Sequence, residues 1–502
     1  MLAEELDGAD PPTCTVQVRP RIQQHDQTNR GAHVELFIDP NGRRGIATQI
    51  YVQLRDAIGD GRLVTGDRLI PSRMLAHELG VSRFTVTDAY ARLRAEGLIE
   101  GQAGGGSVVC GTATRAVVPV ATAALAPTAR AARVQLFDPN PVLHGTFDMR
   151  PGRVDASLFP TGVWRRCMLW ALSEPPDQYG DPAGTIGLRA ALARWVAHSR
   201  GIAVDPAHIV VTSGAQHAID LIARVLVEPG DTVAVEEPGY PPVVELFRLN
   251  GADVVGAPVD EEGIVVDAIP AAARLVVVTP SHQYPLGVTL SHRRRLELLR
   301  WANTHEAAIV EDDYDTEFRH SPRPLEPLQR LDESGRVVYV GTFSKSLAPS
   351  LRIGFAAVPR SIAPAIHALR QAIDWCPPAT TQAALATFID EGHLQRHLRR
   401  ARQVYRQRHQ QMWSQLTQKL AGRAHALPAH AGLHITLLLA DELADDEIRA
   451  ATRANGILVD SLRRNYHFDA PTSGLVVGFG ALPTDQVPTA VDALAAALAS
   501  TD

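Results

Sequence analysis

The chain has 502 residues, of which 45% are hydrophobic and 21% charged, and its formal net charge is -6. This length is well beyond the roughly 250–300 residues at which a single core stops growing, so we expect more than one domain, and the composition is that of a globular protein. Four widely separated cysteines argue against a zinc site or a disulfide framework, and no apolar run is long enough to cross a membrane, so we expect a cytoplasmic protein without a metal centre.

The N-terminal segment, residues 1–43, is predicted to be a disordered tail, because its first 33 or so residues are polar and show no hydrophobic period. From Gly45 the pattern changes. Ile46, Ile50, Leu54 and Ile58 are spaced four apart, which predicts a helix with one apolar face.

Two further helices follow this first one. Pro71 and Ser72 open a helix over 73–79, and Ser82 is a plausible N-cap for another over 83–96. Two helices joined by a tight glycine-containing turn form a helix-turn-helix. Residues 97–109 are predicted to form two strands around a glycine turn, so the whole of 44–110 is expected to be a winged helix-turn-helix domain.

The stretch from Gly61 to Val109 resembles the GntR-type winged-helix DNA-binding domain, with helices and wing all matched in GRLVTGDRLIPSRMLAHELGVSRFTVTDAYARLRAEGLIEGQAGGGSVV. Residues 43–110 also carry nine Arg, no Lys and seven Asp or Glu, a local net charge of about +2. Ile70 and Phe84 depart from the family pattern. The implied DNA contacts are Ser72 and Arg73 at the start of the supporting helix, Ser82, Arg83 and Thr85 at the head of the recognition helix, and the wing around Gly105.

Among these residues, Arg83 is the expected base reader, because a guanidinium pairs bidentately with a guanine edge. Arg92 and Arg94 are expected on solvated helix faces. The implied partner is double-stranded operator DNA.

Residues 111–146 are rich in Ala, Val, Thr and Pro and show no defensible period, so they are predicted to be a linker. Residues 147–502 then alternate helical patterns with short apolar runs. The clearest runs are 209–212, 232–235, 275–278 and 308–310. Continuous β-branched runs separated by helices predict an α/β domain with a mainly parallel sheet covered on both faces.

Lysine is rare in this chain, since only Lys345 and Lys419 occur among the 49 Lys and Arg residues. Arginine can replace lysine as a charge or donor, but it cannot act as the amine nucleophile of a Schiff base. Lys345 follows the apolar run 337–340 and a turn of small residues, which predicts an amine at the carboxyl end of a buried strand, where ligands bind in open α/β sheets. The alternative is a surface loop lysine, and Lys419 is expected on a helix surface.

Other polar segments also follow predicted strands. Residues 212–216 begin a helix with small residues, which suits a phosphate group, and 311–315 supply carboxylates that suit a protonated pyridine nitrogen. These acids could also form a solvated turn or a metal site, but no histidine cluster accompanies them in the sequence. Tyr240 could stack on a planar ring, and Arg352 could reach the same phosphate.

The C-terminal part resembles fold-type I aminotransferases, and its combination with the winged helix resembles the MocR/GabR-type family of transcriptional regulators that depend on pyridoxal 5′-phosphate (PLP). The motifs that carry this resemblance are YGDPAG, TSGAQHA, EEPGYP, TPSHQYPLG, EDDYDTEFR and GTFSKSLAPSLRIGF. The resemblance runs from about Arg44 to the C-terminus.

The resemblance implies a role for each matching residue. Lys345 forms the internal aldimine with PLP, Asp312 pairs with the pyridine nitrogen, with Asp313 as the alternative, and Tyr314 donates towards the 3′-oxygen. Tyr179 would reach the phosphate from the partner subunit, which implies a head-to-tail homodimer. The remaining implied contacts are Tyr240 on the ring and Ser213, Gly214, Ala215, Thr342 and Arg352 on the phosphate.

Three positions depart from the related enzymes. Tyr284 stands where aminotransferases generally carry asparagine, Pro242 stands where GABA-responsive members have an anchoring arginine, and the segment 473–480 lacks the arginine that holds a substrate carboxylate. Losing a charge-assisted contact costs roughly 1.5–3 kcal/mol, so a conventional α-amino acid or GABA is disfavoured as effector. PLP itself, or an amine anchored elsewhere, is expected instead.

The sequence therefore predicts a DNA-binding transcriptional regulator whose aminotransferase-like domain binds PLP and senses PLP or an amine. One alternative is a working aminotransferase with an accessory DNA-binding domain. The other is a regulator whose large domain binds a small ligand without PLP.

Overall fold

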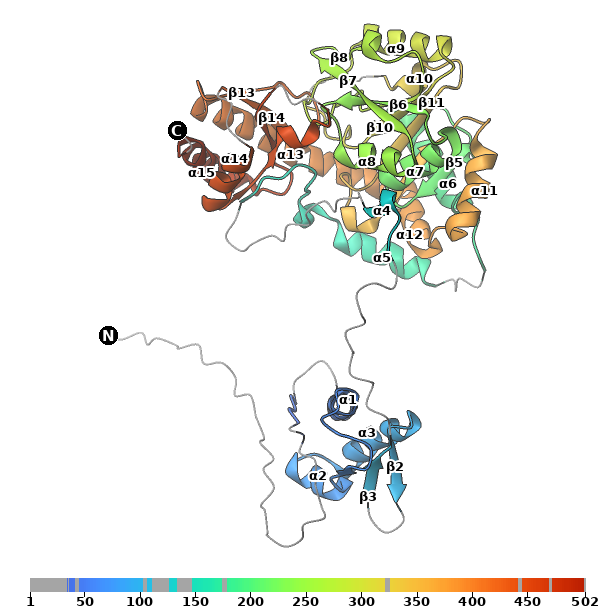
Figure 1. Ribbon diagram of the computed structural model, residues 1–502, viewed down its shortest axis with the longest axis vertical. Coiled ribbons are helices and arrows are strands. Elements are labelled where there is room, and N and C mark those ends of the chain that lie inside the picture. Colours follow the sequence, from blue (N-terminus) through green and yellow to red (C-terminus); the bar gives the residue numbers. More distant parts are fainter. Residues whose placement is uncertain are drawn as a thin grey trace, which may run out of the picture. The chain divides into compact units, whose positions relative to one another are not determined.

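The computed structural model describes residues 34, 36–40, 45–102, 106–110, 126–132, 147–173, 178–320, 326–440, 445–468 and 472–500. The chain divides into two compact units, Met1–Pro127 and Thr128–Asp502 (Figure 1). None of the helices in these described ranges is both long enough and apolar enough to cross a membrane.

The first unit is a three-helix domain with a small antiparallel sheet, in the strand order β1-β3-β2. Its elements are α1 (Ile46–Gly59), β1 (Arg68–Leu69), α2 (Ser72–Glu78), α3 (Arg83–Ala95), β2 (Ile99–Gln102) and β3 (Gly106–Val109). The three predicted helices and the two predicted wing strands are confirmed. The short strand β1, which pairs with β3, was not predicted, because two residues carry no readable period.

The apolar face of α1 forms part of the core of this unit. Ile50, Leu54 and Ile58 are at most 4% exposed and belong to one cluster with Val86 and Leu93 of α3. The predicted N-cap of α3 is confirmed, because the Ser82 side chain accepts a hydrogen bond of 3.1 Å from the Thr85 amide. The apolar spacing therefore predicts the buried face of α1, and the Ser82 cap predicts where α3 begins.

Part of the predicted tail belongs to this unit. Leu36 is 5% exposed and lies in the core, and the amides of Phe37 and Asp39 donate to the side chains of Gln53 and Gln49 at 2.8 and 2.9 Å. The prediction of a disordered tail is therefore wrong for residues 36–39. Two glutamine side chains on α1 satisfy the backbone of a segment that has no periodicity of its own.

The predicted linker lies largely outside the described residues. Within 111–146 the structure describes 126–132, which include the four-residue helix α4 (Ala129–Ala132). Residues 1–33 and 41–44 of the predicted tail also lie outside the described ranges.

The second unit contains an eight-stranded sheet in the order β5-β12-β11-β10-β9-β6-β7-β8. The strands from β11 to β7 are parallel to one another, whereas β12 and β8 pair antiparallel with their neighbours. The four clearest strands predicted for this domain are present, and so is the predicted strand before Lys345. In sheet order the strands are β5 (Ile209–Thr212), β12 (Gly354–Ala357), β11 (Val337–Thr342), β10 (Ala308–Asp313), β9 (Ala273–Val278), β6 (Thr232–Glu237), β7 (Asp253–Asp260) and β8 (Gly263–Ile264).

Helices cover both faces of this sheet (Figure 1). Two successive residues of β5 belong to different core clusters, Val210 to one and Val211 to the other. Because neighbouring side chains of a strand point to opposite faces, a continuous apolar run requires two covered faces. The helices of this part are α5 (Thr161–Ala171), α6 (Ile186–Arg200), α7 (Ala215–Leu226), α8 (Pro241–Leu249), α9 (His292–Thr304), α10 (Leu328–Leu331), α11 (Ala363–Asp374) and α12 (Ala379–Asp390).

The C-terminal part of the second unit begins with the long helix α13 (His393–Lys419) and adds a second, antiparallel sheet in the order β13-β14-β17-β16. This sheet was not predicted as such. A further pair, β4 (Phe147–Asp148) with β15 (Ile457–Leu458), joins the start of the unit to this part. The other elements are β13 (Ala424–Ala426), β14 (His434–Leu439), α14 (Asp445–Ala454), β16 (Asp460–Ser461), β17 (Gly474–Gly478) and α15 (Val487–Ala499).

Candidate functional site

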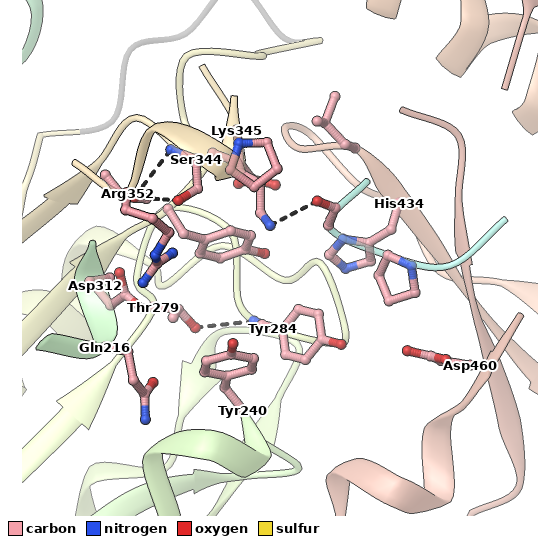
Figure 2. Close-up of a pocket in the computed structure, with 18 residues that line it drawn as sticks. Gln216, Tyr240, Thr279, Tyr284, Asp312, Ser344, Lys345, Arg352, His434 and Asp460 are labelled. Atoms are coloured by element: carbon pink, nitrogen blue, oxygen red, sulfur yellow. Dashed lines mark hydrogen bonds between the residues drawn. The ribbon is translucent and has the colours of Figure 1, made fainter. Parts of the chain in front are cut away.

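A cavity of about 340 Å³ lies at the carboxyl ends of the parallel strands. Strand β10 contributes Asp312, β11 ends at Thr342, and Thr279 directly follows β9. The second sheet supplies His434 and Asp460 (Figure 2). The cavity is thus bounded by both sheets, and it lies where the α/β architecture predicts a ligand.

Lys345 lies inside this cavity, and the alternative of a surface loop lysine is wrong. Its Nζ donates a hydrogen bond of 2.8 Å to the carbonyl oxygen of Gly152 (Figure 2). Burial lowers the pKa of the Lys345 amine, and Arg153 and Arg352 act in the same direction, against Asp315 and Asp312. A lowered pKa increases the fraction of neutral amine, which is the nucleophilic form.

Asp312 and Asp313 point to opposite faces of β10. Asp312 lines the cavity and its Oδ1 has no hydrogen-bond partner among the described residues. Asp313 lies on the other face, where Arg200 forms an ion pair of 2.6 Å with it and Tyr339 donates its hydroxyl proton to it. Strand alternation therefore brings Asp312, and not the alternative Asp313, to Lys345.

Burial favours the neutral form of the Asp312 carboxyl. Burial, together with the charges of Asp313 and Asp315, raises its pKa to about 7, against the opposing effect of Lys345. An unpartnered buried carboxyl oxygen is costly unless a donor comes to it. The site thus offers an acceptor for a protonated ligand group.

Five residues predicted to hold a phosphate gather at one end of the cavity. Ala215, Thr342 and Arg352 line it, and Arg352 Nη2 donates to the carbonyl oxygen of Ser213 at 2.6 Å. Gly214, with φ of 93°, is the residue before α7 and takes a backbone conformation that favours glycine. The start of this helix, with one guanidinium beside it, is suited to an anion.

Three tyrosines surround the space between Lys345 and α8. Tyr240 and Tyr284 meet edge to face at 5.6 Å between ring centroids, and Tyr284 meets Tyr314 in the same way at 6.1 Å. All three line the cavity. The residue that replaces the usual asparagine, Tyr284, therefore lies in the site as an aromatic wall.

A buried polar cluster beside Tyr314 was not predicted from the sequence. Its hydroxyl lies 2.8 Å from His282 Nδ1, which also lies 3.0 Å from Asp315 Oδ1. The His434 ring is tilted against that of His282, with 4.7 Å between the ring centroids. The inference that no histidine cluster accompanies the acids is wrong, because β14 brings His434 to His282 and Asp315 from more than a hundred residues away in the sequence. His282 lies in the motif TPSHQYPLG and Asp315 in the motif EDDYDTEFR. The sequence therefore contained both residues in recognised motifs, but it did not predict that they contact each other.

Ligand atoms of His282, Asp315 and His434 lie within 4.8 Å of one another, a spacing that a metal ion could use. His282 Nδ1 already contacts Asp315 and Tyr314, and His434 Nε2 lies 2.9 Å from the carbonyl oxygen of Pro285. Tyr314, His282 and Asp315 are therefore joined by hydrogen bonds that orient the Tyr314 hydroxyl, and His434 packs beside His282.

Tyr179 lies apart from this cavity. Its side chain is 80% exposed and stacks on Trp375 at 5.0 Å between ring centroids. No residue lining the described cavity comes from the segment around it.

The predicted DNA contacts lie at the starts of α2 and α3. Ser72 begins α2 with Arg73 next to it, and Ser82, Arg83 and Thr85 surround the start of α3. Arg83 is exposed, and no carboxylate of a described residue forms an ion pair with it. Gly105 lies outside the described residues.

The cavity ends differ in charge. Arg352 is the one arginine among the described lining residues and stands at the phosphate end, whereas Asp460 stands on the opposite side, well apart from it in Figure 2. The missing carboxylate anchor inferred from residues 473–480 is thus not replaced by another guanidinium among the described lining residues. An acid stands at that side instead.

In the ligand-free protein we expect Asp312 to contribute a loss of stability as pH rises from 4 to above 7. The pKa of Asp312 is about 7 in the folded chain and 3.8 in the reference state, so the folded state binds more protons in this window and raising the pH favours unfolding. Asp312→Asn, which cannot ionise, should flatten the fall in melting temperature between pH 5.5 and 8.5. The exposed Asp267→Asn serves as control, and equal profiles for wild type and Asp312→Asn would contradict this assignment.

Comparisons with known proteins agree with both units. Residues 46–109 match the family of bacterial regulatory proteins called gntR, and residues 168–494 match aminotransferase class I and II. The chain is 34% identical to the probable rhizopine catabolism regulatory protein MocR of Rhizobium meliloti, over 92% of this chain and 95% of that protein. It is 32% identical to the pyridoxine biosynthesis transcriptional regulator PdxR of Corynebacterium glutamicum, over 90% and 96% of the two chains.

Among solved structures, the second unit is similar to the kynurenine aminotransferase of Pyrococcus horikoshii, which was crystallised in complex with PMP. That likeness has a TM-score of 0.66 at 28% identity and covers 71% of this chain and 91% of the other. Both units of the chain therefore have known counterparts. The chain is a member of the MocR-type family of DNA-binding transcriptional regulators, in which a GntR winged helix precedes an aminotransferase-like domain.

Proposed function

We propose that the cavity around Lys345 binds PLP and that the protein regulates transcription in response to PLP or an amine. The observation that carries this proposal is the unpartnered Oδ1 of buried Asp312, which faces the same cavity as the Lys345 amine. When bound, PLP supplies an aldehyde that condenses with primary amines. The donors and acceptors present match its phosphate, its ring nitrogen and its aldehyde.

Each residue has a defined task in this proposal. Lys345 supplies the amine that holds the cofactor covalently, and Asp312 accepts a hydrogen bond from the protonated ring nitrogen. Tyr314, oriented by His282 and Asp315, donates towards the ring oxygen. The phosphate is held by Ser213, Gly214 and Ala215 at the start of α7, together with Thr342 and Arg352, and Tyr240 packs on the ring.

The partner subunit completes the proposed assembly. Tyr179 is highly exposed and lies outside the cavity of its own chain, which suits a side chain that reaches the phosphate of a second copy in a head-to-tail homodimer. A dimer would also present two winged helices to two half-sites of operator DNA. The effector acts on DNA binding only through a difference in its affinity for two arrangements of the dimer.

The effector is proposed to be an amine that carries no carboxylate at its far end. A carboxylate there would meet no guanidinium among the described lining residues, whereas Asp460 offers an ammonium group an acceptor. Burial raises the pKa of Asp460, and Arg464, Arg150 and Arg449 oppose that effect and offset part of its charge. We expect 1,4-diaminobutane to change the visible spectrum of the PLP-loaded protein at several-fold lower concentration than 4-aminobutanoate. Asp460→Asn should narrow this difference, and the reverse order of the two amines in wild type would contradict the proposal.

The name of one relative, a pyridoxine biosynthesis regulator, supports PLP itself as the second candidate effector. A gel-shift of the upstream intergenic DNA distinguishes the two candidate effectors. If PLP is the effector, PLP alone changes DNA binding; if an amine is the effector, the change requires the amine as well. The working-aminotransferase alternative is tested by mixing the PLP-loaded protein with amino donors and keto acids. We expect no sustained turnover, because no second guanidinium among the described lining residues holds a substrate carboxylate.

A further inference from the structure

A second cavity of about 450 Å³ lies in the same unit, apart from the Lys345 cavity, and we name it the arginine pocket. It is formed by the end of α6, the segment that follows β10 and the first half of α13. Trp195, which is 7% exposed, contributes to its wall. Its five arginines are Arg200, Arg319, Arg399, Arg402 and Arg406.

Asp313 and Glu317 are both paired with Arg200, while the Oε2 atom of Glu317 has no hydrogen-bond partner among the described residues. Arg200 forms ion pairs of 2.6 Å with Asp313 and 2.7 Å with Glu317. Arg402 donates from Nε to the backbone carbonyl oxygen of Glu317 at 2.6 Å. Within the described ranges, no carboxylate lies within ion-pair distance of Arg319, Arg399 or Arg406, so the pocket carries an excess of positive charge.

This excess charge is partly removed from water. Arg200 is buried, and Arg319 and Arg402 are half-buried. Burial lowers the pKa of the Arg319 guanidinium, and the charge of Arg200 acts in the same direction. Burial also lowers the pKa of Arg402, and Arg200, Arg406 and Arg399 add to that effect against Glu317. Like charges brought together away from water are destabilising, and a bound anion would offset that cost.

The arrangement of the arginines suits a small anion more than a DNA backbone. Arg399, Arg402 and Arg406 are spaced three and four apart, so they share one face of α13. Arg399 and Arg406 are exposed at the rim, whereas Arg319 and Arg402 lie deeper. A phosphate of duplex DNA would reach the rim, but a free phosphate group can enter a cavity of this size and meet guanidinium groups from several sides.

We propose that the arginine pocket binds a small phosphate-bearing anion, either inorganic phosphate or a phosphate monoester. The segment that follows β10 links this pocket to the Lys345 cavity, because Asp312, Tyr314 and Asp315 line one and Thr316, Glu317 and Arg319 line the other. The inference does not depend on whether the Lys345 cavity binds PLP.

The test measures binding of inorganic phosphate to the full-length chain by calorimetry at low ionic strength. The protein carries Arg352→Gln, so that the phosphate end of the first cavity lacks its guanidinium. We expect saturable binding, weakened about tenfold or more when Arg399→Gln and Arg406→Gln are added, since two charge-assisted contacts are lost. Melting curves establish that each variant is folded.

The matched control is Arg396→Gln with Arg400→Gln, which makes the same change in charge on exposed positions of α13 outside the pocket lining. We expect it to change phosphate affinity by less than about twofold, since isolated surface charges contribute little. An equal loss in both double variants, or no saturable binding below roughly 1 mM, overturns the proposal. If the pocket variant weakens binding of unrelated duplex DNA but leaves phosphate binding unchanged, the arginines contact a DNA backbone and the proposal is wrong.

Discussion

Lys345→Ala is expected to abolish covalent attachment of PLP. Wild-type protein incubated with PLP should show a visible absorbance band that borohydride removes, because the amine of Lys345 lies in the cavity with a lowered pKa. The variant keeps the groups at the phosphate end and Asp312, so PLP should still bind weakly and reversibly. The measurement is the absorbance spectrum before and after reduction, followed by mass spectrometry of the reduced protein.

The chain offers a matched control in its other lysine. Lys419 ends α13, contacts Asp492 on α15 and does not line the cavity. Lys419→Ala should leave the band and the mass increase unchanged. A band that survives in Lys345→Ala, or a PLP adduct that maps to Lys419, would show that the cofactor assignment is wrong.

Arg83→Ala is expected to weaken operator binding strongly. Arg83 is the first residue of α3, its side chain is exposed, and no described carboxylate pairs with it. A bidentate contact between a guanidinium and a guanine contributes roughly 1–3 kcal/mol, which corresponds to about five- to 150-fold in affinity. Gel-shift titrations of the upstream intergenic DNA measure this loss, and PLP uptake should be unchanged.

Arg94→Ala is the control for this variant. Arg94 lies near the other end of α3 and its guanidinium approaches the hydroxyl of Ser107 at 3.5 Å, so it is engaged with the wing. Both variants remove one positive charge from the same helix. Equal affinities for the wild type and Arg83→Ala, or a larger loss in Arg94→Ala, would assign the base contact to another residue.

Lys345 and the winged helix could be predicted because their signals are local. Lysine is so rare in this chain that its place after a β-branched run is informative by itself. The three helices of the first unit follow from apolar spacing, from the Ser82 cap and from a glycine turn, all within about 50 residues. The motifs around these residues were sufficient to identify the family.

The sequence did not predict which of two adjacent acids, Asp312 or Asp313, faces the cavity. Asp312 and Asp313 have equivalent chemistry, and only the register of β10 in the sheet decides which one faces the cavity. A shift of one residue would exchange their environments, because strand side chains alternate. The tertiary structure places Arg200 beside Asp313 and leaves Asp312 towards Lys345.

The His282 cluster, Asp460 and the arginine pocket were also decided by tertiary structure alone. The cluster and the pocket combine residues from elements that lie far apart in the chain, such as His434 with Asp315, or Arg200 with Arg402. Asp460 is likewise brought to the Lys345 cavity from a distant strand. Their contacts depend on how the second sheet and α13 pack against the first sheet. Local sequence records the propensity of a segment and the chemistry of a side chain, whereas burial and long-range charge pairing exist only once the segments are packed.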